Sequence, residues 1–243
     1  MAREARRKGG PARVRAQKES PRPSFATWLA VTKKTAPATA VNFCYGWTLW
    51  LFLTWIPSFF VQSYHASLTG SAFYSAGVFF GGFAGDALGG IASDAVLRAT
   101  GNLVLARRSI IVAGFAGSCV CLFGVMLVTE IRLAAVLLSL AFFFAELVVA
   151  PIWAVTMDTV PRHAGLASGI MNFGSAFAGI LSPLFYGIVV DLTGSWTIPF
   201  SVSVALLVLG AALSFALHPG EKAGAAKFQE LEATSFGTGG GAA

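Results

Sequence analysis

The sequence predicts an all-α integral membrane protein with six transmembrane helices. Of its 243 residues, 56% are hydrophobic and only 12% are charged, and the mean hydropathy is +0.71. Such a composition is too apolar for a water-soluble domain. Most of the 27 glycines lie inside apolar runs, where small residues allow transmembrane helices to approach closely. The bilayer is therefore the predicted solvent of this chain.

Six apolar stretches are each long enough to cross a hydrocarbon core about 30 Å thick, which takes roughly 20 helical residues. They cover residues 38–60, 72–96, 109–128, 133–157, 164–190 and 196–217. Residues 25–37, which include Trp28, predict an interfacial segment before the first span. The predicted organisation is thus a basic tail or loop remnant (1–24), this interfacial segment, a six-helix bundle (38–218) and a flexible tail (219–243).

The basic residues predict how the bundle is oriented. Ten of the 17 Lys and Arg lie within residues 1–34, and every one except Arg132 falls on the same side of the six spans. The positive-inside rule then places both termini in the cytoplasm, with the bundle in a cell membrane. This charge lies in a tail without a nucleic-acid motif, so we expect it to face anionic lipid headgroups, and no nucleic acid is expected as a partner.

Two carboxylates, Asp86 and Glu146, fall within the apolar runs. An ionised carboxylate at the bilayer centre costs roughly 2.5 to 3.5 kcal/mol, so both side chains should face protein or water. They are the candidates for groups that take up and release protons within the membrane. The structural alternative is a carboxylate that accepts hydrogen bonds from a neighbouring helix or stays protonated. No metal-ligand spacing, P-loop or nucleophile–base pair is visible, so neither a metal, a cofactor nor an enzyme is predicted.

Polar groups on three spans predict a site for a polar organic solute. In the first span Asn42 and Trp50 are eight residues apart on one side, with Tyr45 beside them. In the fourth span Glu146 and Trp153 are seven residues apart and share a face. The alternative is that these side chains belong to packing or to an interfacial belt.

The fifth span carries a stripe of mostly small residues. The stripe consists of Gly165, Ser168, Gly169, Asn172, Ala176, Gly179 and Pro183, with Ser175 at its margin. Small residues alone are typical of a helix-packing seam. An amide near the middle of the membrane needs hydrogen-bond partners, so Asn172 favours a contact with solute.

The sequence "GGIASDAVLRATGNLVLARR" (89–108) resembles the loop between transmembrane helices eight and nine of the major facilitator superfamily, with its G-x-x-x-D…R signature. The matching positions are Gly90, Asp94, Arg98 and Arg108. Three further stretches, "NFCYGWTLWLFLTWIP", "AELVVAPIWAVTMD" and "AGLASGIMNFGSAFAGILSPLFYGIVVDLTGSW", look like helices seven, ten and eleven of its anion:cation symporter family. That family includes hexuronate, glucarate, galactonate and phthalate permeases.

The resemblance implies helices seven to twelve, the second half of a twelve-helix transporter whose solute site lies between the halves. It implies proton-coupled symport of a small organic anion by alternating access, with the first half or a second copy as partner. The implied cavity wall consists of Asn42, Tyr45, Trp50, Glu146, Trp153, Asn172 and Ser175.

The resemblance also implies two cytoplasmic latches. In one, Asp94 is held by a nearby cation such as Arg98 or by a helix N-terminus; in the other, Asp158 is held by Arg162. The simpler alternative is a cationic loop that only sets topology. Two other functions stay open: a half-transporter subunit that needs a partner or homodimerises, and an inactive fragment or interaction protein.

Overall fold

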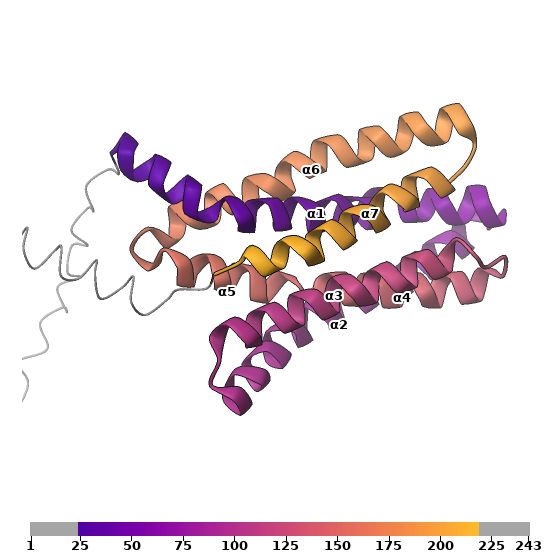
Figure 1. Cartoon of the computed structure of the whole chain (residues 1–243). Coiled ribbons are helices and arrows are strands. Elements are labelled where there is room, and N and C mark those ends of the chain that lie inside the picture. Colours follow the sequence, from indigo (N-terminus) through magenta and orange to yellow (C-terminus); the bar gives the residue numbers. More distant parts are fainter. Residues whose placement is uncertain (1–23, 219–243) are drawn as a thin grey trace, which may run out of the picture.

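The computed structural model describes residues 24–218, which fold into a bundle of helices (Figure 1). The helices are α1 (Phe25–Tyr64), α2 (Leu68–Thr100), α3 (Leu103–Val125), α4 (Ile131–Glu146), α5 (Val149–Thr159), α6 (Ala164–Thr193) and α7 (Thr197–Leu213), with 3-10 turns η1 (Pro161–His163) and η2 (Ser214–Ala216). The all-helical prediction is confirmed, and α4 and α5 together form the predicted fourth span. The predicted tails, 1–23 and 219–243, lie outside the described residues.

Local capping explains where several helices begin and end. The side chains of Ser67 and Asn102 accept hydrogen bonds from backbone N–H groups three residues later, which satisfies donors at the starts of α2 and α3. Helices α2 and α6 end at Gly101 and Gly194, whose φ angles of 64° and 63° are left-handed and favour glycine. These caps produce the tight reversals that place consecutive helices antiparallel.

Helix α1 is a single helix of 40 residues that includes the predicted interfacial segment. At 1.5 Å per residue it is about 60 Å long, roughly twice the thickness of the hydrocarbon core. Its first turns run at an angle to the rest (Figure 1), and Pro37 lies inside the helix, where a missing N–H permits a bend. The segment 25–37 therefore continues directly into the first span.

The fourth span is broken beside its carboxylate. Helix α4 ends at Glu146 and α5 begins at Val149. Pro151 has no N–H, so the carbonyl of Leu147 lacks the donor that a continuous helix would supply. Just before it, the N–H of Val148 donates at 3.3 Å to the carbonyl of Ala145, three residues back rather than four. The sequence did not predict this break, which places Glu146 at a helix end.

Glycines let α2 pack closely against α4. A side chain on Gly81, Gly85 or Gly89 would overlap the backbone carbonyls of Ser139, Phe143 and Leu147, respectively. These two sets of residues advance together by four, so the helices touch backbone to backbone along one seam. Gly82, Asp86, Gly90 and Asp94, which also follow one another at intervals of four, form a different line along α2, and both of these aspartates are exposed.

Five segments among the described residues have the length and apolar composition of a membrane span. They are α1, α3, α4 with α5, η1 with α6, and α7 with η2. Helix α2 has 33 residues, among them many glycines and serines together with Asp86, and it is not one of these five segments. It corresponds to the predicted second span.

Candidate functional site

A buried pair of polar side chains joins α1 to the end of α4. The hydroxyl of Tyr45 donates a hydrogen bond to Oε1 of Glu146 over 3.0 Å. The exposed fractions are only 7% for Tyr45 and 9% for Glu146. The sequence contains no Lys or Arg between residues 35 and 97 or between 133 and 161, so the partner of this carboxylate is a neutral phenol rather than a cation.

The structure separates the two carboxylates that the sequence singled out. Asp86 is exposed on α2, whereas Glu146 is only 9% exposed and is enclosed by the bundle. A role of Asp86 in proton coupling stays a prediction.

The seam between α1 and α6 engages three of the predicted solute contacts. Nδ2 of Asn42 donates to the carbonyl of Met171 at 3.1 Å, and Nε1 of Trp50 donates to the carbonyl of Ser175 at 3.2 Å. A side chain on Gly46 would come within 2.6 Å of Ser175 Oγ, so the helices are in close contact here. These groups serve helix packing in this structure, and their contact with solute stays a prediction.

Asn172 and Trp153 lie on the outside of this half-bundle. Asn172 is exposed on α6, and Trp153 is 36% exposed on α5. Nothing lies within 4 Å of where a side chain on Gly165 or Gly169 would begin, so the first part of the small stripe is an open face. Further along α6, Gly179 packs against the indole of Trp50. The stripe therefore combines an open face with a packing seam.

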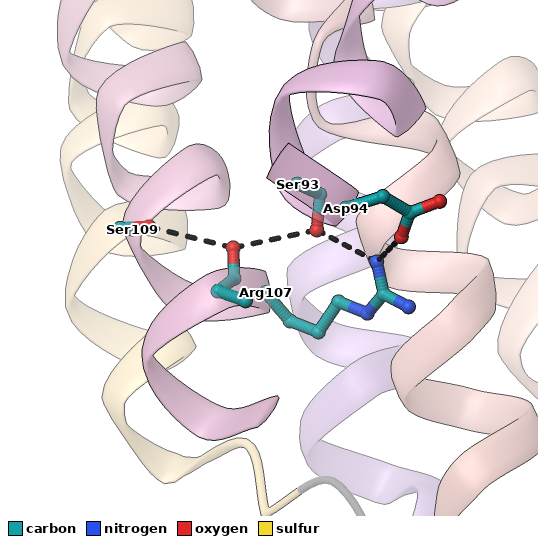
Figure 2. Close-up of polar contacts among 5 residues, drawn as sticks. Ser93, Asp94, Arg107 and Ser109 are labelled. Carbon is teal, nitrogen blue, oxygen red and sulfur yellow. Dashed lines mark hydrogen bonds and ion pairs between the residues drawn. The ribbon is translucent and has the colours of Figure 1, made fainter. Parts of the chain in front are cut away.

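A polar cluster around Arg107 lies where α2 ends and α3 begins (Figure 2). Its Nη1 atom lies 2.8 Å from Oδ1 of Asp94 and donates to the hydroxyl of Ser93 at 2.8 Å. Ser93 and Ser109 both donate to the carbonyl of Ala106, at 3.3 and 3.4 Å. The cluster connects the last turns of α2 to the first turns of α3.

Arg107, and not Arg98, is thus the cation that contacts Asp94. Arg98 is exposed one turn further along α2, whereas the side chain of Arg107 is only 13% exposed and is oriented by Ser93. Arg98 was the cation expected from the sequence. Adjacent residues on a helix point about 100° apart, so Arg107 and Arg108 reach different parts of the bundle.

The next arginine in the sequence, Arg108, binds carbonyls in and just after η2, the turn that follows α7. Its Nη2 atom donates to the carbonyls of Phe215 at 2.9 Å and Leu217 at 3.0 Å, and its guanidinium lies 5.5 Å from the centre of the Phe215 ring. The structure therefore places Arg108 between α3 and η2 rather than against Asp94.

Three further residues of the predicted latches occupy different parts of the same end. Gly90 faces Ala150, and a β-carbon added to this glycine would lie 3.4 Å from the alanine methyl group. Asp158 lies in the last turn of α5, and Arg162 lies in η1. A latch between Asp158 and Arg162 stays a prediction.

Comparison with known proteins decides the family. The profile of the Major Facilitator Superfamily matches residues 3–183 and 41–239. The chain belongs to the major facilitator superfamily. With its long apolar helices, it is a multi-pass membrane protein.

Three relatives in this superfamily carry names that refer to organic anions. A probable sulfoacetate transporter of Cupriavidus necator is 39% identical over 79% of this chain and 45% of its own length. In Bacillus subtilis, a probable galactarate/D-glucarate transporter is 36% identical over 74% of this chain and 39% of its own, and a hexuronate transporter is 32% identical over 78% and 46%. The chain matches less than half the length of each.

Proposed function

We propose that this chain forms the C-terminal half of a transporter for a small organic anion, such as a sugar acid or another small carboxylate or sulfonate. The proposed mechanism is symport with protons by alternating access, in which this bundle rocks against a second six-helix half around a site at the middle of the membrane. Its support is the superfamily membership and the names of the three relatives, each of which denotes a transporter of an organic anion.

The hydrogen bond between Tyr45 and Glu146 is the observation that carries the proton coupling. A carboxylate that is 9% exposed, and that has no cation as its partner, costs much less in the membrane when it holds a proton than when it is charged, although the hydrogen bond from Tyr45 reduces the difference. Movement of the helices that exposes this group to water reverses that balance. The carboxylate can therefore take up a proton in one conformation and release it in another.

The open face that carries Asn172 and Trp153 is the proposed contribution of this half to solute binding. An amide and an indole can bind the hydroxyl, carboxylate or sulfonate oxygens of a solute. The middle of this half carries acids but no Lys or Arg, so the cation that balances the solute charge must come from the other half. Tyr45, Asn42, Trp50 and Ser175 would then support the site from the seam behind it.

The test compares two carboxyl-to-amide substitutions in the native transporter. The protein is purified with an antibody against residues 219–243 and reconstituted in vesicles. Glu146→Gln is expected to abolish accumulation driven by a proton gradient while leaving exchange of solute across the membrane intact. Asp191→Asn, at the exposed end of α6, is the matched control and should behave as the unmodified protein. Normal gradient-driven accumulation by Glu146→Gln would remove Glu146 from the mechanism.

A half-transporter subunit is the second candidate function, because the chain matches only 39 to 46% of the length of the three relatives. Solute binding by the purified 243-residue chain distinguishes it from an inert fragment. A rise in unfolding temperature with galactarate, glucuronate or sulfoacetate favours a binding half, since a ligand that binds only the folded state stabilises it. Crosslinking then shows whether the active unit holds one copy or two.

A further inference from the structure

The first turns of α1 carry an apolar face that the rest of the bundle leaves uncovered. Phe25, Trp28 and Leu29 are exposed by 81%, 45% and 42%. With 3.6 residues per turn these three side chains share one side of the helix. Val31 and Thr35 are buried, with exposed fractions of 3% and 1%. Thr35 follows Trp28 by seven residues and lies on nearly the same side of the helix, so the bundle covers this side only further along α1. The apolar side is therefore open in the first turns of the helix.

Basic residues accompany the open face. Lys33 and Lys34 are exposed in the same turns, and Lys33 borders the apolar side. The remaining eight of the ten Lys and Arg in residues 1–34 precede this segment in the sequence. An apolar face that contains tryptophan and is bordered by lysine matches the chemistry of the layer where acyl chains meet phospholipid headgroups.

The length and direction of α1 agree with this location. The helix is about twice as long as the hydrocarbon core is thick, so a large part of it must lie outside that core. Figure 1 shows its first turns running obliquely to the axis of the rest of the helix. A helix that bends in this way can follow the membrane surface.

We infer that residues 25–36 form a membrane-surface helix that binds anionic phospholipid headgroups, with Phe25, Trp28 and Leu29 inserted among the lipids and Lys33 at the phosphates. The inference does not depend on the transported solute. A neutral lipid surface would accommodate the three apolar side chains but would not balance the charge of Lys33, which is why the partner is anionic. A lysine near such a surface contributes about fivefold to the preference for anionic lipid.

Spin labels on the 243-residue chain test the depth of this helix. Leu29→Cys and Ala30→Cys place labels on the apolar side and about 100° around the helix from it, in a background where Cys44, Cys119 and Cys121 are replaced by alanine. In nanodiscs that contain phosphatidylglycerol, the label at position 29 should collide with oxygen and be shielded from a water-soluble nickel chelate. The label at position 30 should be accessible to the chelate.

Lipid preference tests the role of Lys33. Lys33→Gln should lower the preference for phosphatidylglycerol over phosphatidylcholine by about fivefold, and inorganic phosphate should not compete with the lipid. Arg132→Gln, exposed at the start of α4, is the control. The inference is overturned if the label at position 29 is open to the chelate, if it is shielded from both reagents by protein, or if Lys33→Gln leaves the preference unchanged.

Discussion

Removing the phenol hydroxyl of Tyr45 isolates the contact at the centre of the proposed mechanism. Tyr45→Phe deletes one oxygen and leaves the ring, and the oxygen is the hydrogen-bond donor to Glu146 at 3.0 Å. Both side chains are less than 10% exposed, so water cannot readily take its place. A hydrogen bond contributes about 1 kcal/mol between neutral groups and about 1.5 to 3 kcal/mol to a charged one. Hydrogen bonds between membrane helices lie toward the low end, near 0.6 kcal/mol.

These figures predict that Tyr45→Phe lowers the free energy of unfolding by about 1 to 2 kcal/mol. The assay is reversible unfolding of the purified chain in mixed micelles. Tyr74→Phe is the control, because Tyr74 is half-buried and its hydroxyl takes no part in the contact with Glu146. A double-mutant cycle with Glu146→Leu separates the pair from other effects. If Tyr45→Phe costs no more than Tyr74→Phe, or if the cycle gives no coupling, the hydrogen bond does not hold Glu146.

Three further substitutions test the packing and the polar contacts around the site. Gly85→Ala places a methyl group against a carbonyl of α4 and should cost about 1 to 3 kcal/mol in unfolding free energy, whereas Gly77→Ala, with open space around it, should cost little. Arg107→Gln breaks a partly exposed ion pair and should lower the free energy of unfolding by up to about 1 kcal/mol, whereas Arg98→Gln should change it little. Equal effects would contradict the assignment of Arg107 as the partner of Asp94. Arg108→Gln should speed hydrogen exchange in the last turns of α7 while leaving α2 unchanged, and unchanged exchange in α7 would show that this arginine does not anchor them.

The spans were predictable because about 20 apolar residues in sequence admit few structures other than a membrane helix. Their internal breaks were not. Pro151 interrupts the fourth span after Glu146, whereas Pro57 and Pro183 lie within uninterrupted helices. A proline removes one hydrogen bond in each case, and the packing of neighbouring helices decides whether the helix also divides.

The site was predictable as a set of residues but not as a set of contacts. Spacing along one helix placed Asn42 and Trp50 together correctly, yet it could not show that their donors bind carbonyls of α6, because that depends on how two helices meet. The same limit explains Arg107. Its partner, Asp94, is 13 residues away and lies on a different helix, whereas Arg98 was the nearer cation in sequence.

Simultaneous recording of solute uptake and external pH tests the central claim most directly. The native protein is purified with an antibody against residues 219–243 and reconstituted in vesicles without an ion gradient. Galactarate, glucuronate or sulfoacetate is then added to the external solution. The account predicts that at least one of these anions enters and that the external solution becomes more alkaline as it does so, with both signals lost in Glu146→Gln. Uptake without any movement of protons, or movement of protons that Glu146→Gln leaves unchanged, would contradict it.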